Sequence, residues 1–237
     1  MGKINKSVIL YSGGLDSTTL LYKAINEEYE VFPLTFSYSQ KHSIEISICQ
    51  QHLKKIGIKN HQIVNLTPDI FLGSALTSSI DIPKNRSTEE MDSEIPTTYV
   101  PVRNLIFLST AVAYAESINA KNIFIGVNAL DYSGYPDCRP DFIQSFQKTA
   151  NLASREGRAG RPITIHTPLL HLKKHEIIQL GLDNNVPYES TWSCYDPVSL
   201  ANHTFAPCHE CDSCILRETG FEKLGRVDPL KKINVII

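Results

Sequence analysis

The sequence predicts an α/β protein built around a doubly wound, mostly parallel β-sheet. Short apolar and β-branched segments alternate along the chain with longer segments whose apolar residues recur at helical spacing. Strands and helices that alternate in this way join through right-handed crossovers into a parallel sheet. The chain has 237 residues, of which 42% are hydrophobic, and this is enough to bury a core around one large sheet.

The first repeat of the alternation lies before residue 37. Ser7 to Tyr11 is a β-branched and apolar run that ends at a glycine pair, which is typical of a buried strand. Ser17 to Ile25 places its apolar residues at helical spacing, and Tyr29 to Phe36 is again strand-like. These three segments predict a βαβ unit.

The alternation continues through the next 150 residues. The same criteria predict helices at 44–56, 105–117, 142–152 and 173–182, and strands at 62–66, 122–127 and 163–166. Ligands of such sheets bind beyond the carboxyl ends of the strands. We therefore expect the functional residues in the segments that follow the strands.

Two segments interrupt the repeat and suggest the domain organisation. Residues 67–96 are rich in Pro, Ser and mixed charges, and we interpret them as a mobile insertion or lid, with a solvated surface loop as the alternative. Residues 186–237 contain four of the six cysteines. The prediction is an α/β domain at 1–185 and a small C-terminal module at 186–237.

Charge and hydropathy restrict the partners. The formal net charge is -2, from 23 basic and 25 acidic residues, and this disfavours strong electrostatic binding to duplex DNA or whole tRNA. No apolar stretch approaches the ~18 residues of a membrane span, and the first apolar run is too short for a secretory signal. We expect a cytoplasmic protein whose cysteines are reduced thiols or metal ligands.

The turn after the first predicted strand has the composition of a phosphate-binding loop. Its glycines allow positive φ and close backbone approach, and the helix that follows presents free N–H groups to an anion. It lacks the Lys-Ser/Thr pair of a Walker A loop. The Asp16 carboxylate requires Mg²⁺ as a bridge to phosphates, or else it anchors the loop. The predicted binding residues are Tyr11, Ser12, Gly13, Gly14, Leu15, Asp16, Ser17 and Thr18.

Four cysteines of the C-terminal module predict a metal site. Four thiolates that converge on one ion form a closed tetrahedral Zn²⁺ site, and the alternative is an iron–sulfur cluster. We expect His209 to be exposed, and Cys49, which lies in an apolar-patterned helix, to belong to the core. The predicted ligands are Cys194, Cys208, Cys211 and Cys214.

Residues 128–140 follow a predicted strand and combine aromatic, acidic and basic side chains. Aromatic faces suit a flat purine-like ring, and carboxylates accept hydrogen bonds from its amino and N–H groups. An arginine here also suits a substrate carboxylate. The alternative is a polar loop with a structural role only, which caps the next helix. The predicted substrate-binding residues are Asp131, Tyr132, Tyr135, Asp137, Cys138 and Arg139.

The glycine loop resembles a known signature. Its Ser12-Gly-Gly-Leu-Asp-Ser17 run is similar to the Ser-Gly-Gly-x-Asp-Ser motif of the PP-loop ATP pyrophosphatases. The resemblance implies an adenine nucleotide alpha hydrolase-like fold. It also implies that ATP is cleaved between its α and β phosphates to give an adenylated intermediate.

Further motifs resemble one branch of that superfamily, the 7-cyano-7-deazaguanine synthases. These motifs are Tyr99-Val-Pro-Val-Arg-Asn104, Gly126-Val-Asn128, Asp131-Tyr-Ser-Gly-Tyr-Pro-Asp-Cys-Arg139, Thr167-Pro-Leu169 with Lys174 and Glu176, and Thr191-Trp-Ser-Cys-Tyr195 with Arg217. Val102 and His209 stand where glycine is common in this family, and a β-branched residue adopts positive φ only at a cost.

The resemblance implies an ATP-dependent ligase of the queuosine pathway. Such an enzyme converts 7-carboxy-7-deazaguanine and ammonia, through an amide, to 7-cyano-7-deazaguanine. The implied catalytic residues are Ser12, Asp16, Lys174 and Arg103, which would hold the phosphates of ATP with Mg²⁺. We expect free ammonia as the nitrogen donor, no nucleic-acid or membrane partner, and a homodimer.

Two alternatives remain open at this stage. A tRNA-thiolating PP-loop enzyme would need a nucleophilic cysteine near its adenylate, and Cys138 is placed to serve as one. A non-enzymatic zinc-ribbon interaction protein would consume no ATP at all.

Overall fold

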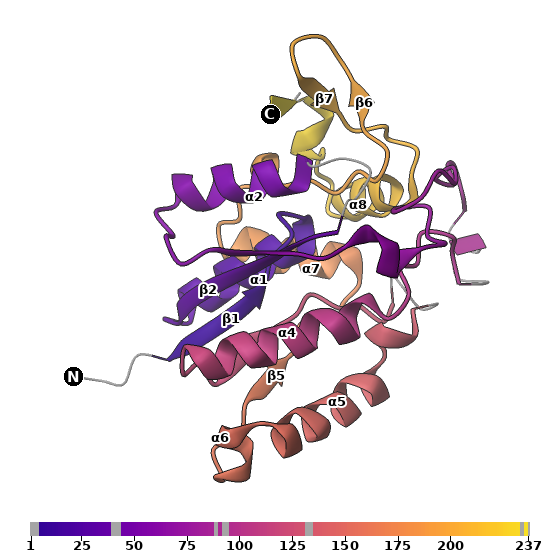
Figure 1. Ribbon diagram of the computed structural model, residues 1–237. Coiled ribbons are helices and arrows are strands. Elements are labelled where there is room, and N and C mark those ends of the chain that lie inside the picture. The colour runs from indigo at the N-terminus through magenta and orange to yellow at the C-terminus, as the bar shows by residue number, and fades with distance from the viewer. Residues whose placement is uncertain are drawn as a thin grey trace.

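The computed structural model describes residues 5–38, 44–87, 90–91, 95–130, 135–232 and 235–236 (Figure 1). Its centre is a five-stranded sheet in the order β3-β2-β1-β4-β5, in which every neighbouring pair is parallel. The strands are β1 (Lys6–Leu10), β2 (Glu30–Ser37), β3 (Gln62–Asn65), β4 (Asn122–Phe124) and β5 (Thr164–His166). The doubly wound α/β fold predicted from the sequence is therefore confirmed.

Helices connect these strands. They are α1 (Leu15–Asn26), α2 (Ile44–Lys55), α4 (Arg103–Ser117), α5 (Pro140–Ala153), α6 (Arg155–Arg158), α7 (Lys174–Asp183) and α8 (Asp212–Lys223). Short 3₁₀ turns lie at Pro68–Phe71, Pro136–Cys138, Tyr188–Ser190 and Pro229–Lys232. Each helix and strand predicted from the sequence is present, with boundaries that differ by at most three residues.

The sheet is covered on both faces, which explains why its inner strands β1 and β2 are buried almost throughout their length. Successive side chains of a strand point to opposite faces. Val8 and Ile123 pack in the cluster that contains α4 and α5, whereas Ile9 and Phe124 pack in the cluster that contains α1 and α7. All four of these strand side chains are buried, as expected for a parallel sheet between two helical layers. Figure 1 shows α4 and α5 on the side of the sheet away from α1 and α7.

The strand order reverses between β1 and β4. The chain runs from β1 outward to β2 and β3, and then returns to place β4 on the other side of β1. The loops at 11–14 and 125–128 follow these two adjacent parallel strands, so they meet at the carboxyl edge of the sheet. This switch point is the usual place for a ligand in an open α/β fold.

The described part of the 67–96 segment has many exposed residues, as expected of a surface loop, but some of its side chains are packed against the rest of the protein. Phe71 and Ala75 have no exposed surface and belong to the main core cluster. The Lys84 ammonium lies 3.0 Å from the Asp196 carboxylate, and Arg86 forms a two-pronged ion pair with Asp212. Contacts with residues distant in sequence therefore hold this segment.

The C-terminal part of the chain forms a small second sheet. Its strands β6 (Val198–Ser199), β7 (Thr204–Ala206) and β8 (Val235–Ile236) pair antiparallel in that order. Helix α8 packs closely on α7 where Gly220 faces Lys174, because a Cβ at position 220 would lie 2.8 Å from the Lys174 Cγ. Among the described residues, none of the helices combines the length and the apolar character needed to cross a membrane.

Candidate active site

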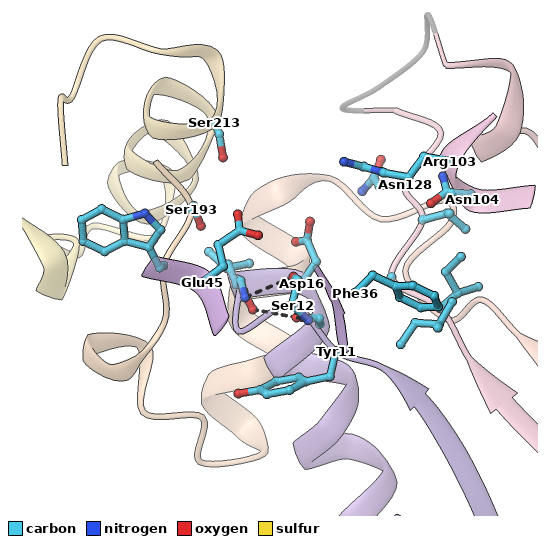
Figure 2. Close-up of a pocket in the computed structure, with 18 of the residues that line it drawn as sticks. Tyr11, Ser12, Asp16, Phe36, Glu45, Arg103, Asn104, Asn128, Ser193 and Ser213 are labelled. Atoms are coloured by element: carbon cyan, nitrogen blue, oxygen red, sulfur yellow. Dashed lines mark hydrogen bonds between the residues drawn. The ribbon is translucent and has the colours of Figure 1, made fainter. Parts of the chain in front are cut away.

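A cavity of about 240 Å³ opens at the switch point of the sheet (Figure 2). Five parts of the chain line it: the turn after β1, the end of β2, the start of α4, the loop after β4, and the C-terminal segment at 192–217. The start of α2, Tyr135 and Cys138 near the 3₁₀ turn before α5, Lys174 at the start of α7 and Leu76 of the 67–96 segment also contribute to the lining. The sequence-predicted phosphate loop and the predicted metal module therefore face one space.

Hydrogen bonds among its own side chains shape the glycine loop. The Ser17 hydroxyl accepts from the Ser12 backbone N–H at 3.2 Å and donates to the Gly14 carbonyl at 3.2 Å, and the two serine hydroxyls lie 3.1 Å apart. Gly13 has a φ of 72°, and a Cβ there would lie 3.0 Å from the Cys49 sulfur. Only glycine fits this turn, which directs the first N–H groups of α1 toward the cavity.

Asp16 and Lys174 form an ion pair beside the loop. The Lys174 ammonium donates to both oxygens of the Asp16 carboxylate, at 2.8 and 3.0 Å. Asp16 lies in the first turn of α1, and Lys174 is the first residue of α7. The Glu176 carboxylate accepts a hydrogen bond from the Lys173 backbone N–H and so caps the N-terminus of α7. The structure thus brings together two predicted catalytic residues from distant parts of the sequence.

Arg103 lies on another wall of the cavity. It is the first residue of α4, and its guanidinium donates to the Tyr38 hydroxyl at 3.1 Å and lies 5.9 Å from the centre of the Phe107 ring. The Phe36 and Phe107 rings stack at 3.9 Å. Figure 2 shows Arg103, Asn104 and Asn128 across the opening from Ser12 and Asp16. This wall combines flat apolar surfaces with amide and guanidinium donors.

The predicted substrate loop has a different role for each of its residues. Tyr135 and Cys138 line the cavity, and the Tyr135 and Thr98 hydroxyls lie 3.1 Å apart. Asp137 does not line it: this buried carboxylate accepts the Asn104 backbone N–H at 2.8 Å, at the start of α4. Arg139 is exposed and also lies outside the lining. Asp131 and Tyr132 lie outside the described residues.

Cys138 is a buried, neutral thiol in this environment. Its side chain is 4% exposed, and the Asn104 amide nitrogen lies 3.3 Å from the sulfur. Burial, together with the neighbouring Asp137 carboxylate, raises the pKa of Cys138 to about 12. A thiol with such a pKa is protonated at neutral pH, which is the opposite of what an activated nucleophile needs.

The four predicted metal ligands converge. The sulfur atoms of Cys194, Cys208, Cys211 and Cys214 all lie within 4.8 Å of one another. A tetrahedral Zn²⁺ site with bonds of about 2.3 Å needs sulfur atoms about 3.8 Å apart, so this donor set fits zinc. Hydrogen bonds among the four thiols lower the pKa of Cys208 and of Cys211 and raise the pKa of Cys194 and of Cys214, so two of the four favour the thiolate form that a metal requires.

The metal cluster is continuous with the cavity wall. Cys194 itself lines the cavity, as do Ser193 and Tyr195 next to it and Ser213 before the last ligand. Arg217 on α8 also lines the cavity, and its buried guanidinium forms a two-pronged ion pair with Asp228 at 2.7 and 3.0 Å. The Trp192 backbone N–H donates to the Gly13 carbonyl at 2.9 Å, so this segment also supports the glycine loop.

Comparison with known protein families identifies the relatives of this chain. The model of the family described as "Queuosine biosynthesis protein QueC" matches residues 6–225. The chain belongs to the QueC family. Curated proteins agree: the 7-cyano-7-deazaguanine synthase of Nostoc punctiforme is 52% identical over 226 residues, which cover 95% of this chain and 98% of the relative. The synthase of Desulfatibacillum aliphaticivorans is 50% identical over 96% of this chain and 97% of its own.

Solved structures support the fold of this QueC-family chain. A 4-thiouridine synthetase, in complex with RNA and bound ATP, is similar with a TM-score of 0.50 and 17% sequence identity. The match covers 78% of this chain and 42% of that protein. At this identity the likeness shows a shared fold alone. It agrees with the PP-loop, adenine nucleotide alpha hydrolase-like architecture expected from the sequence.

Several cavity residues of the QueC-family chain were missed by sequence reasoning. Glu45 and Tyr38 flank a stretch of the chain between β2 and α2, Phe107 lies on α4, and Ser193 and Ser213 belong to the metal module. The one available signal was position, because Tyr38 and Glu45 follow the carboxyl end of β2. Ser193 lies within the Thr191-Trp-Ser-Cys-Tyr195 motif but was given no role there, and Ser213 and Phe107 have no distinguishing sequence context.

Proposed function

We propose that this protein is an ATP-dependent ligase, a 7-cyano-7-deazaguanine synthase of queuosine biosynthesis. The observation that carries the proposal is the near full-length match, at about half identity, to curated synthases of that name. The cavity adds support, because a phosphate-type loop, a paired lysine and a wall of flat side chains face one space. Such a site suits ATP next to a planar, carboxylated base.

In this proposal the triphosphate lies along the glycine loop. The Ser12 and Ser17 hydroxyls and the first N–H groups of α1 bind phosphate oxygens, and Lys174 supplies positive charge. The Asp16 and Glu45 carboxylates both line the cavity and would hold Mg²⁺ against the phosphates. Mg²⁺ would neutralise charge on the leaving pyrophosphate. When nucleotide binds, Lys174 has phosphate oxygens as well as Asp16 for its three donors.

The reaction then proceeds through two adenylations. The substrate carboxylate attacks the α-phosphorus of ATP and pyrophosphate leaves, which gives a mixed anhydride. Ammonia attacks the carbonyl carbon, AMP leaves, and one proton is released as the amide forms. The amide oxygen attacks the α-phosphorus of a second ATP, and pyrophosphate and one amide proton leave. The C–O bond then breaks, and loss of AMP and of the second amide proton leaves the nitrile. The chain contributes by positioning the groups in line and by stabilising charge at phosphorus.

The rings of adenine and of the deazaguanine would pack against the walls that contain Phe36, Tyr38, Phe107 and Tyr135. Aromatic faces bind flat rings through stacking and apolar contact. The Asn104 and Arg103 side chains add hydrogen-bond donors on the same side of the cavity. We propose that Asp137 acts indirectly by fixing the start of α4, and that Cys138 contributes apolar surface.

The thiolation alternative is not favoured. It required Cys138 as a nucleophile, and this thiol is buried and has a raised pKa. The non-enzymatic alternative is not favoured either, because the chain belongs to a family whose curated members are synthases.

We further propose that the cysteine cluster binds a structural Zn²⁺, that residues 186–237 form the module around it, and that the protein acts in the cytoplasm as a homodimer. Exposed apolar side chains support self-association: Leu72 is 70% exposed, Ile95 53% and Val102 48%. Sedimentation velocity tests the dimer. A species of twice the chain mass supports it, and a monomer at micromolar concentration contradicts it.

The direct test of the function is a reconstitution assay. The protein is incubated with 7-carboxy-7-deazaguanine, ammonium and Mg-ATP, and the products are separated and identified by mass. The proposal predicts the 7-cyano product, the amide as an intermediate, and pyrophosphate, with none of them formed when ATP is omitted. An enzyme that releases no nitrile but transfers sulfur to tRNA would overturn the proposal.

A further inference from the structure

Arg103 differs from the other cations of the cavity in its partners. Lys174 is paired with Asp16, and Arg217 is paired with Asp228. Arg103 forms no ion pair with any carboxylate in the part of the chain that the structure describes, and its one hydrogen bond there is to the Tyr38 hydroxyl. A partly buried cation without an anion has lost hydration that one hydroxyl and one aromatic ring replace only in part. The geometry therefore leaves a place for an anionic ligand.

The orientation of Arg103 is fixed from several sides. Its backbone begins α4, where the Asp137 carboxylate binds the N–H of the next residue. Its guanidinium lies over Phe107 and against the Tyr38 hydroxyl, and it faces the cavity. A planar guanidinium held in this way is suited to a carboxylate, which it binds through two parallel hydrogen bonds.

The position of Arg103 separates it from the phosphate loop. Figure 2 shows the guanidinium on the opposite side of the opening from Ser12 and Asp16, whereas Lys174 lies directly against the Asp16 carboxylate. The loop side already provides hydroxyls, N–H groups and a lysine for phosphates. Arg103 instead lies on the wall that contains the aromatic side chains.

We propose that Arg103 binds the carboxylate of the deazaguanine substrate and orients it for attack on ATP, and does not bind the phosphates. This inference rests on the proposed function and revises the sequence-based expectation for Arg103. It has a consequence for the two halves of the reaction. The first adenylation starts from a carboxylate, but the second starts from a neutral amide, which carries no charge for the guanidinium to pair with. Arg103 is therefore specific to the first half.

The test compares Arg103→Gln with the unaltered protein on two substrates, the acid and the amide intermediate. With the acid, kcat/KM for the variant falls about 30- to 100-fold, mostly through KM, because a charge-assisted pair is lost. With the amide, nitrile formation stays within about threefold of the unaltered protein, as expected when a neutral group loses no ion pair. KM for ATP changes little in either case.

Controls make each outcome informative. Lys174→Gln, which alters the phosphate side, should lose both conversions, and Arg155→Gln, whose side chain is 73% exposed, should lose neither. Equal loss of both conversions in Arg103→Gln, or no loss with the acid, overturns the proposal. If Arg103→Gln has a lowered melting temperature, Arg103→Met, which also lacks the charge, is assayed in its place with the same criteria. Failure of the unaltered protein to convert either substrate would refute the proposed function and with it the role of Arg103, whereas the outcomes above, in which only the variant departs from expectation, refute the role of Arg103 alone.

Discussion

At the residue scale, the Asp16–Lys174 pair links the two helices that begin at the cavity. Asp16→Asn removes the charge that holds the Lys174 ammonium and one carboxylate available to Mg²⁺. We expect kcat for pyrophosphate release to fall about 100-fold or more, because the loss of one preorganised electrostatic group has this size of effect. The variant should still fold, but with a lowered melting temperature, since Lys174 is only 9% exposed and loses the carboxylate that pairs with it. A variant with unaltered turnover would contradict the phosphate-loop assignment.

Cys138 provides a residue-scale prediction in the opposite direction. Cys138→Ser preserves the size of the side chain and its contact with the Asn104 amide, and burial with a pKa near 12 keeps the native thiol neutral. Nitrile formation should stay within about threefold of the unaltered protein, since no covalent step passes through this sulfur. Steady-state kinetics with and without prior iodoacetamide treatment check this. Loss of turnover by more than 100-fold would restore the nucleophile hypothesis.

His52 on α2 makes the stability depend on pH. Its ring is 3% exposed between Tyr11 and Tyr22, neither ring nitrogen has a hydrogen-bond partner within the described residues, and burial lowers the pKa of His52. The folded protein therefore binds fewer protons here than the unfolded chain. Stability from this group is complete above the unfolded pKa of about 6.5 and is lost as the pH falls toward the lower folded value.

We test this dependence with His52→Leu. Denaturant unfolding between pH 7.5 and 5.5 should show a smaller decline in the free energy of unfolding than in the unaltered protein. Burial also lowers the pKa of His61 and of His166, so part of the decline should remain in the variant. Parallel curves for the two proteins would show that His52 does not contribute.

Individual site residues could be predicted where the local sequence alone determines the geometry. The glycine loop is such a case, because Gly13 needs both positive φ and the space beside Cys49. Asp137 and Arg139 were expected to face the substrate from composition alone, but side-chain direction depends on the 3₁₀ turn at Pro136–Cys138 and on the start of α4. Composition contains no information on that packing.

At the element scale, α4 begins with an unfavourable residue. Val102 precedes the helix with a φ of 47°, a left-handed conformation that costs an L-residue about 1–2 kcal/mol. Val102→Gly relieves this strain and adds some unfolded-state entropy, so we expect a net gain of about 0.5–1 kcal/mol, or about 2 °C in melting temperature. Val227→Gly, at an exposed position that does not have positive φ, should give no gain. Calorimetry that shows a loss at position 102 would contradict the strain argument.

The elements themselves follow closely from hydrophobic periodicity, since every predicted helix and strand is present. The 67–96 segment is the exception. Its buried residues Ala75 and Ile82 lie in turns and irregular chain, and Phe71 ends a short 3₁₀ turn, because the surfaces that they cover set their positions and regular secondary structure does not. The polar, proline-containing composition of this segment did not predict its ion pairs with the C-terminal part of the chain.

At the scale of the whole molecule, the metal cluster and the cavity share residues. Loss of the metal should release Cys194, Ser193 and Ser213 from the cavity wall as well as loosen the module. Cys208→Ser is therefore expected to lower the melting temperature by about 10 °C or more and to raise KM for ATP. Metal analysis should find about one zinc per chain in a colourless protein. If metal-free, folded protein has an unaltered KM for ATP, the metal cluster does not support the cavity. A brown, iron-containing protein would show that the four cysteines bind an iron–sulfur cluster and not zinc.

In the proposed reaction the glycine loop holds ATP so that a carboxylate becomes an adenylate. The most direct measurement uses 7-carboxy-7-deazaguanine labelled with ¹⁸O in both carboxylate oxygens, with ATP and ammonium, followed by mass spectrometry of the released nucleotide and phosphate. We expect each labelled carboxylate oxygen to be transferred to the phosphoryl group of one AMP, one in each half of the reaction, and the pyrophosphate to be unlabelled. Label in inorganic phosphate with ADP as the nucleotide product, or unlabelled AMP, would contradict it.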